Sequence, residues 1–94
     1  MFVILITYQK PLSEIDAHLA AHRAFLDVCY QQNKLLASGP RKPRTGGVLI
    51  STLTERSMVD ALIQQDPFYQ NGLANYEIIE FDAVKHHPGF KAFL

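Results

Sequence analysis

Cysteine is scarce in this sequence, because Cys29 stands alone among 94 residues. A single cysteine cannot form an internal disulfide, and Cys29 lacks the spaced Cys or His partners that a structural zinc site needs. A reducing compartment therefore fits best. Long apolar runs are also missing. The run near the start, residues 2–6, has no basic segment before it and is too short for a signal-peptide core or a membrane span. We expect a cytoplasmic chain with no membrane partner.

An excess of either charge is absent as well, since nine Lys and Arg balance nine Asp and Glu. Without net positive charge the chain has no general attraction to phosphate backbones, so nucleic acid is not expected as a partner. The sequence also lacks a Gly-rich phosphate loop and a dinucleotide fingerprint. We therefore expect a chain that uses no cofactor.

Apolar residues, in contrast, make up 48% of the chain, which is enough for it to fold. At this length we expect one domain that spans residues 1–94. A domain this small has only a modest core, and pairing with a second copy is a simple way to enlarge that core. The length therefore predicts a homodimer, and it leaves open whether dimers associate further.

Apolar periodicity places six elements along the chain. The first strand, residues 2–8, is apolar at almost every position, as in a strand covered on both faces. Ser13 can cap the helix that follows, and Asn33 is a left-handed terminator for it. Thr54 can cap a second helix, which Asp66 stops because it precedes a proline. The predicted strands are residues 2–8, 35–38, 48–53 and 74–81, and the predicted helices are residues 13–31 and 55–65, with a turn at 68–72.

The order of strand, helix, strand, strand, helix, strand predicts a ferredoxin-like α+β plait, which is a four-stranded antiparallel sheet with two helices on one face. No helix is left to cover the other face, although its strands are too apolar to lie in water. A second copy of the chain would cover that face. The tail, residues 82–94, carries Val84, Phe90, Phe93 and Leu94, so we expect it to pack on the domain or on the dimer partner.

Two titratable residues, His22 and Asp66, are the strongest candidates for chemistry. His22 falls in the apolar stripe of the first predicted helix, and an imidazole exchanges protons near neutral pH. Burial alone more often means a core histidine whose nitrogens bond to the backbone. Asp66 stands at the end of the second predicted helix, where it either initiates a turn or, if the two helices lie side by side, orients His22.

Other polar residues at strand ends and in loops are candidates for ligand binding. Ser38 and Gly39 can present a hydroxyl and a backbone amide to a ligand, or they only shape a turn. Arg41, Lys42 and Arg44 can receive a substrate carboxylate or phenolate, although such loop cations are more often solvated. Tyr8, at the end of the first strand, can line a pocket or simply pack.

A metal site is not expected from the histidines of the tail. His86 and His87 are adjacent, so on an extended segment they point in opposite directions, and no Cys or carboxylate cluster completes a ligand set. Cys29, on the stripe of the first helix, is more consistent with a small buried apolar side chain than with a nucleophile.

Four segments give the chain a resemblance to a known family. They are the opening strand with Tyr8, AHRAFL at residues 21–26, LASGP at residues 36–40 and QDPF at residues 65–68. In order and spacing they resemble the YciI-like (YCII-related) family of the dimeric α+β barrel superfamily, over most of residues 1–82. Residues 85–90 lie outside this pattern.

The resemblance implies a homodimer and an active-site pocket with a His-Asp pair, carried here by His22 and Asp66. Most members of the family have no established reaction. Where relatives have one, it is the removal of chloride from a chlorinated hydroxyquinol, and a broader relation to muconolactone isomerase is suggested.

The favoured hypothesis is a cofactor-free enzyme in which His22, oriented by Asp66, transfers a proton on a small cyclic oxygenated substrate. Lyase, dehydrochlorinase or isomerase-type chemistry would fit such a pair. The alternative is a dimeric module that binds a small ligand in the same pocket and performs no chemistry. A monooxygenase resembling other dimeric α+β barrel proteins ranks last, since the chain has no Trp and no haem-ligation motif.

Overall fold

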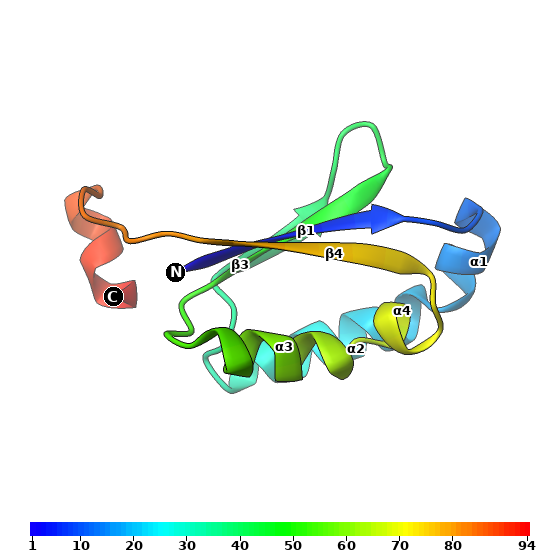
Figure 1. The fold of residues 1–94 in the computed structure, drawn as a ribbon, viewed down its shortest axis with the longest axis horizontal. Coiled ribbons are helices and arrows are strands. Elements are labelled where there is room, and N and C mark those ends of the chain that lie inside the picture. The colour runs from blue at the N-terminus through cyan, green and yellow to red at the C-terminus, as the bar shows by residue number, and fades with distance from the viewer.

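The computed structural model describes residues 1–94 and contains one antiparallel sheet with its helices on one face (Figure 1). The sheet order is β2-β3-β1-β4, which is the order of a ferredoxin-like plait, so the predicted α+β fold is confirmed. None of the helices is both long and apolar enough to cross a membrane. The strands are β1 (Phe2–Tyr8), β2 (Ala37–Pro40), β3 (Gly46–Ser51) and β4 (Ala74–Glu80), and the helices are α1 (Leu12–Ala17), α2 (Leu19–Gln31), α3 (Arg56–Gln64) and α4 (Pro67–Gln70).

The central position of β1 explains its nearly continuous apolar sequence. It pairs with β3 on one side and with β4 on the other. Phe2, Ile4 and Ile6 point toward the helices and are fully buried, because alternate side chains of a strand share one face. They form the main core together with the apolar stripe of α3, which includes Val59 and Leu62. Cys29 of α2 belongs to the same core, so this core fixes the position of the sheet relative to α2 as well as α3.

Gly46 of β3 lies against the backbone of β1, and it gives a direct test of this packing. A Cβ atom at Gly46 would clash with the backbone carbonyl oxygen of Ile6. We expect Gly46→Ala to lower the free energy of unfolding by about 3 kcal/mol or more, because neither strand can move without breaking the ladder. At Gly39 a Cβ atom would meet nothing within 4 Å. Urea denaturation should therefore show a change of only about 0.5 kcal/mol for Gly39→Ala. Equal losses in the two variants would contradict this register.

The long first helix predicted from periodicity is wrong, because the helix breaks at His18. The backbone of His18 has φ −111° and ψ 4°, and its N–H bonds to the Ile15 carbonyl rather than to Glu14. The ring Nδ1 of His18 lies 3.2 Å from the Glu14 carbonyl oxygen, so the side chain replaces the helical bond. The break lets Ile15 of α1 enter a separate small cluster beside Phe68. Asn33, with φ 57°, takes the predicted left-handed conformation after α2.

Both predicted N-caps are also wrong. Pro11 and Glu55 occupy the cap positions of α1 and α3, and neither helix has a side-chain cap bond, so Ser13 and Thr54 do not cap. Asp66, in contrast, does more than stop α3. It caps α4, a one-turn helix that forms where the sequence predicted only a turn. The backbone of Asp66 is extended and Pro67 occupies the first helical turn, an arrangement suited to helix initiation.

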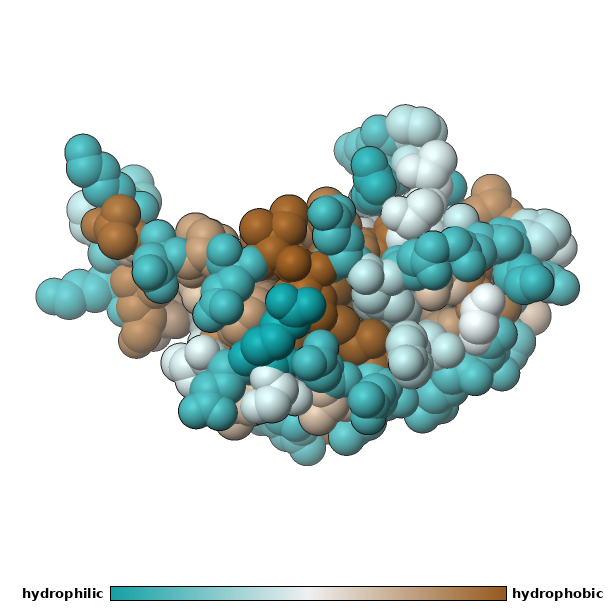
Figure 2. All heavy atoms as spheres, in the orientation of Figure 1, coloured by the Kyte–Doolittle hydropathy of each residue, from teal (hydrophilic) through white to brown (hydrophobic).

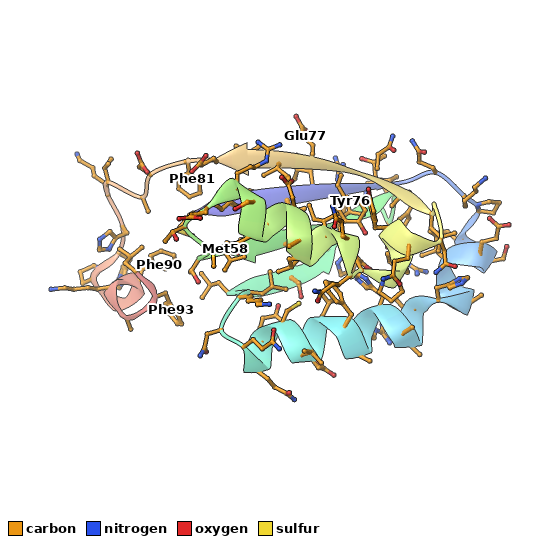
Figure 3. All side chains as sticks on the ribbon, turned by 60° about the horizontal axis from the view of Figure 1, so that its bottom comes forward. Met58, Tyr76, Glu77, Phe81, Phe90 and Phe93 are labelled. Atoms are coloured by element: carbon orange, nitrogen blue, oxygen red, sulfur yellow. The ribbon has the colours of Figure 1, made fainter.

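The tail extends away from the body of the molecule and ends in a short 3-10 helix, η1 (Pro88–Phe93). Val84 is 87% exposed, whereas the rings of Phe90 and Phe93 contact each other, with centroids 5.8 Å apart and planes tilted by 48°, on the side of η1 that faces the body (Figure 3). The last residues line a hollow with Tyr30 and Leu35, at the end of α2. Figure 2 shows a separate group of apolar atoms on this tail, apart from those over the middle of the molecule.

Candidate active site

A buried carboxylate lies at the centre of the site. The Asp66 side chain is 1% exposed, and α4 places it because Asp66 is the cap of that helix. Its Oδ1 accepts from the Phe68 backbone N–H at 3.0 Å, and its Oδ2 accepts from the Tyr76 hydroxyl at 2.6 Å. Its third partner is His22, whose Nδ1 lies 2.7 Å from Oδ1. Every oxygen of this carboxylate therefore has a partner, as a buried charge requires.

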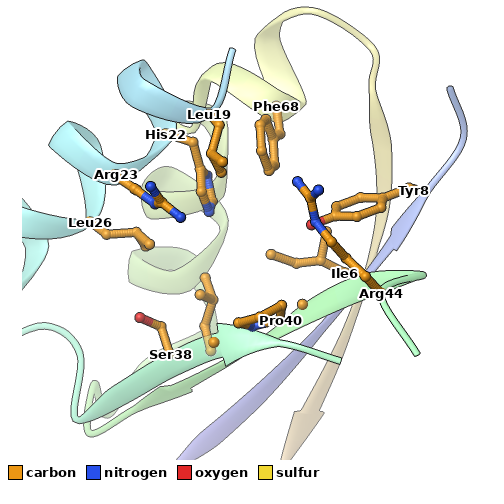
Figure 4. Close-up of a pocket in the computed structure, with 13 residues that line it drawn as sticks. Ile6, Tyr8, Leu19, His22, Arg23, Leu26, Ser38, Pro40, Arg44 and Phe68 are labelled. Atoms are coloured by element: carbon orange, nitrogen blue, oxygen red, sulfur yellow. The ribbon is translucent and has the colours of Figure 1, made fainter. Parts of the chain in front are cut away.

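His22 projects from α2, and its ring is held by a hydrogen bond to Asp66 and by stacking on Phe68. The Phe68 ring stacks on it with centroids 4.0 Å apart and planes 3° apart. An ionised carboxylate only accepts hydrogen bonds, so Nδ1 carries the proton and donates it to Asp66. Nε2 has no partner in the protein, and no buried side-chain polar atom is unsatisfied, so Nε2 must be accessible. His22 lines a cavity (Figure 4), and Nε2 is its free nitrogen there.

That cavity lies between the sheet and α2 and has a volume of about 520 Å³, a size suited to a small ring-shaped ligand. Its walls are mostly apolar, with a few polar groups that can orient a ligand. Thirteen residues line it: Ile6, Tyr8, Leu19, His22, Arg23, Leu26, Ser38, Gly39, Pro40, Arg44, Gly47, Leu49 and Phe68.

The structure brings most of the residues singled out from the sequence to this cavity. Tyr8, Ser38 and Gly39 line it together with His22. Ser38 is held by the Tyr30 hydroxyl, 2.6 Å from its Oγ. Arg41 does not line the cavity. It is exposed at the start of the β2–β3 loop, and Arg44 from the same loop lies at the cavity instead.

The comparison with known families rests on this geometry and on the sequence together. Residues 1–82 match the family model of the YCII-related domain. The chain belongs to the YCII-related domain family. The resemblance identified from its sequence segments is thereby confirmed. No curated protein matches the sequence of this YCII-related chain.

A solved structure shares the fold of the YCII-related chain with a TM-score of 0.72. It is 5-chloro-2-hydroxyhydroquinone dehydrochlorinase from Burkholderia phenoliruptrix, in complex with 2,5-dihydroxybenzoquinone. The two sequences are 23% identical, and the match covers 87% of this chain and 94% of the dehydrochlorinase chain. At this identity the likeness shows a common fold.

Tyr76 and Arg23 are site residues of the YCII-related chain that sequence reasoning missed. Tyr76 lies opposite Ile6 in the β1–β4 ladder and therefore points toward the helices, where it reaches Asp66. Figure 3 shows Tyr76 on the helix side of β4 and the adjacent Glu77 on the other side. The alternation of Ala74, Tyr76 and Ile78 was the available signal. Arg23 falls toward the side of its helix opposite the apolar stripe, so the spacing of apolar residues predicts a solvated side chain there.

The tail histidines, His86 and His87, bond only to neighbouring backbone and not to a carboxylate. The Nδ1 atom of His86 lies 3.1 Å from the carbonyl oxygen of His87, and the His87 ring accepts from the Gly89 N–H. No group of three or more His, Cys, Asp or Glu in the chain is arranged to hold a metal ion.

Burial raises the pKa of the Cys29 thiol, which stabilises its neutral form.

The Tyr76 hydroxyl makes alkaline stability a test of the carboxylate cluster. Burial, followed by the charge of Asp66 and the hydrogen bond to it, raises the pKa of Tyr76 above its usual value of about 10. Above pH ~10 the folded chain keeps the Tyr76 proton, whereas the unfolded chain loses it. The free energy of unfolding is therefore unaffected by this group below pH ~10, and it falls by up to about 1.4 kcal/mol per pH unit above that value. We expect Tyr76→Phe to flatten the fall in unfolding free energy above pH ~10.

Urea denaturation at a series of alkaline pH values measures this slope. Tyr69→Phe is the matched control, because the Tyr69 ring packs edge-on against Tyr76 at 5.8 Å but has no bond to Asp66. It should keep the wild-type slope. An unchanged slope in Tyr76→Phe would mean that the phenol titrates alike in both states.

Proposed function

We propose that this YCII-related domain is a cofactor-free enzyme that transfers a proton on a small, oxygenated ring substrate, with elimination or isomerisation as the result. The observation that carries the proposal is the buried His22–Asp66 pair, which leaves Nε2 as the free nitrogen of a residue that lines a cavity of about 520 Å³. A histidine with only a packing role would have both ring nitrogens bonded to the protein.

In this proposal Nε2 of His22 is the general base and then the general acid. The negative charge of Asp66 stabilises the imidazolium that forms, and its hydrogen bond holds the ring in the tautomer with a free Nε2. Asp66 is a positioning residue, since its oxygens are fully used by His22, Phe68 and Tyr76. The stacked Phe68 ring keeps the imidazole plane fixed toward the cavity. Proton transfer beside a carbonyl or enol needs little more than these groups.

Dehydrochlorination of a chlorinated hydroquinone is the specific reaction that we infer. A hydroxyl proton moves to the ring carbon that bears chlorine, the opposite hydroxyl then loses its proton, and chloride leaves as the second carbonyl forms. The products are a quinone and HCl, so the ring needs no external oxidant. Support comes from the fold shared with 5-chloro-2-hydroxyhydroquinone dehydrochlorinase and from the ring-sized cavity. By the same likeness, 2,5-dihydroxybenzoquinone is a suitable ligand to probe this cavity.

The experiment that tests this function is incubation of the protein with a panel of hydroquinones, chlorinated hydroquinones and cyclic enones in D₂O. Proton NMR then follows deuterium incorporation and new products, and a chloride assay follows elimination. We expect catalytic loss of chloride from at least one chlorinated ring, or deuterium exchange beside a carbonyl. Ligands that raise the melting temperature but are recovered unchanged and without deuterium would instead indicate a binding module.

The functional unit in this proposal is a homodimer formed through the sheet face opposite the helices. The register aligns Val3 with Ile50 on one side and with Ile79 on the other, and it aligns Leu5 with Val48. These side chains occupy the face that no helix covers, where Glu77 of β4 lies beside Leu5, and an exposed apolar patch of this kind favours association.

A lysine on that face tests the dimer. We expect wild type to sediment as a dimer and Val48→Lys to sediment as a monomer, because a buried unpaired charge opposes association strongly. Val28→Lys is the matched control, since Val28 is exposed on α2 on the other side of the molecule. A monomeric wild type would refute the homodimer, and loss of the dimer in both variants would refute the assignment of this face.

A further inference from the structure

The charged side chains that line the cavity are all cationic or basic. Arg23 from α2 and Arg44 from the β2–β3 loop lie on opposite sides of it (Figure 4). No Asp or Glu lines the cavity, and Asp66 lies behind His22 with its oxygens already bonded. A neutral chain has thus placed two cations, and no carboxylate, on a largely apolar cavity.

The two guanidinium groups are held differently, and both keep donors for a ligand. Arg44 pairs with Asp16 of α1 through one nitrogen, which anchors the side chain beside Tyr8. A guanidinium has five N–H donors, so this single contact leaves the others free. Arg23 makes no ion pair in the structure, although Asp27 lies one helical turn away. Its charge is therefore balanced only by solvent.

We infer that this cavity takes its substrate as an anion, a small planar ring with an ionised oxygen, and that Arg23 and Arg44 are the residues that select for that charge. Guanidinium groups match the geometry of phenolate, enolate and carboxylate oxygens, and apolar walls strengthen each contact by excluding water. The inference deepens the proposed function because it concerns the same cavity, but it rests on binding and not on turnover.

Two groups of the substrate ring would then have different partners in the cavity. An oxygen that arrives ionised is neutralised by an arginine, which leaves a second hydroxyl, or a ring carbon, for proton exchange with Nε2 of His22. A neutral ring of the same size could still enter the cavity, but it would displace water from both guanidinium groups without neutralising the charge of Arg23 or filling the free donors of Arg44. Charge, more than shape, should therefore separate ligands from non-ligands.

Calorimetric binding at pH ~7 tests the inference with two probes that differ in charge. The first, 2,5-dihydroxybenzoquinone, is a vinylogous acid and is ionised at neutral pH, whereas the second, hydroquinone, is neutral there and no larger. We expect the acid to bind at least about tenfold more tightly than hydroquinone, since hydrogen bonds between two charged groups are stronger than those to a neutral oxygen. Affinity for the acid should also fall as salt is raised.

Variants of the arginines assign the effect. Arg23→Gln and Arg44→Gln should each weaken binding of the acid by about tenfold, and the double variant by about a hundredfold, with little change for hydroquinone. Arg41→Gln is the matched control, because Arg41 lies in the same loop region but outside the cavity. Asp16→Asn removes the ion pair and keeps the guanidinium, so it should retain most of the affinity.

Two results would overturn the inference, namely equal affinity for the two probes, or binding of the acid that survives loss of both arginines. Both are independent of catalysis, because His22→Gln should still bind the acid. If wild type binds the acid through its arginines but converts no substrate, the proposed reaction fails and the anion selectivity stands. If substrates are converted without dependence on Arg23 and Arg44, the reverse holds.

Discussion

We expect His22→Gln to lower kcat by a factor of about 10² to 10⁴ while the chain stays folded. The amide can still bond to Asp66, so the buried carboxylate keeps a partner, but it has no nitrogen that takes up a proton near neutral pH. The substrate should still bind, because Arg23 and Arg44 remain on the cavity. The expected result is therefore a lower kcat with a KM that changes little.

Steady-state rates on whichever ring substrate the wild type converts provide the measurement, with the melting temperature as the check on folding. His86→Gln is the control, because His86 is exposed in the tail and bonds only to neighbouring backbone. It should keep the full rate. A His22→Gln protein that is folded and retains the wild-type rate would eliminate His22 as the base.

Removing the carboxylate of Asp66 should produce the largest loss of stability in the chain. Asp66→Ala leaves the Tyr76 hydroxyl, the Phe68 N–H and the His22 ring without an acceptor in a buried space. Breaking a buried pair in this way costs about 3 to 5 kcal/mol, which is a large part of the total stability of a domain this size. Asp66→Asn keeps the shape and an acceptor oxygen, so it should cost less, about 1 to 2 kcal/mol.

Urea denaturation compares these variants with Asp60→Ala. Asp60 also forms an ion pair, but its side chain is 53% exposed and its Oδ1 lies 3.7 Å from Nε of Arg56. That change should cost no more than about 0.5 kcal/mol. Similar losses for Asp66→Ala and Asp60→Ala would show that the three bonds to Asp66 do not support the fold.

Asp66→Asn also separates structure from chemistry. The neutral amide can hold the His22 ring but cannot stabilise an imidazolium, so its rate should fall although the protein remains folded.

Most of the fold was predictable from the sequence because its signals are local. The continuous apolar run of β1 predicted a central strand, and the spacing of apolar residues predicted both helical regions. The break at His18 was hidden because Ile15 and Leu19 keep an apolar four-residue spacing across it. An aspartate followed by proline can end one helix and begin the next, so the sequence predicts the end of α3 at Asp66 but does not by itself show that α4 begins there.

The site was predictable only in part, since its contacts join distant segments. His22 could be singled out because it falls within an apolar stripe, and Asp66 because it is a carboxylate at the end of a predicted helix. The alternation along β4 could place Tyr76 on the inner face, but it could not assign the contact with Asp66, because that contact depends on the register of β4 against β1. Arg41 and Arg44 are equally cationic loop residues, and only the path of the β2–β3 loop decides which of them lies at the cavity.

The central claim is that Asp66 holds His22 as the tautomer with a proton on Nδ1 and a free Nε2 at the cavity. Nitrogen-15 NMR of the histidine rings at pH ~8 measures this directly, since protonated and bare ring nitrogens differ widely in chemical shift. The account predicts that His22 shows a protonated Nδ1 and an unprotonated Nε2, and that Asp66→Asn leaves this assignment in place. A His22 ring with its proton on Nε2, or one that averages between tautomers as an exposed histidine does, would contradict it.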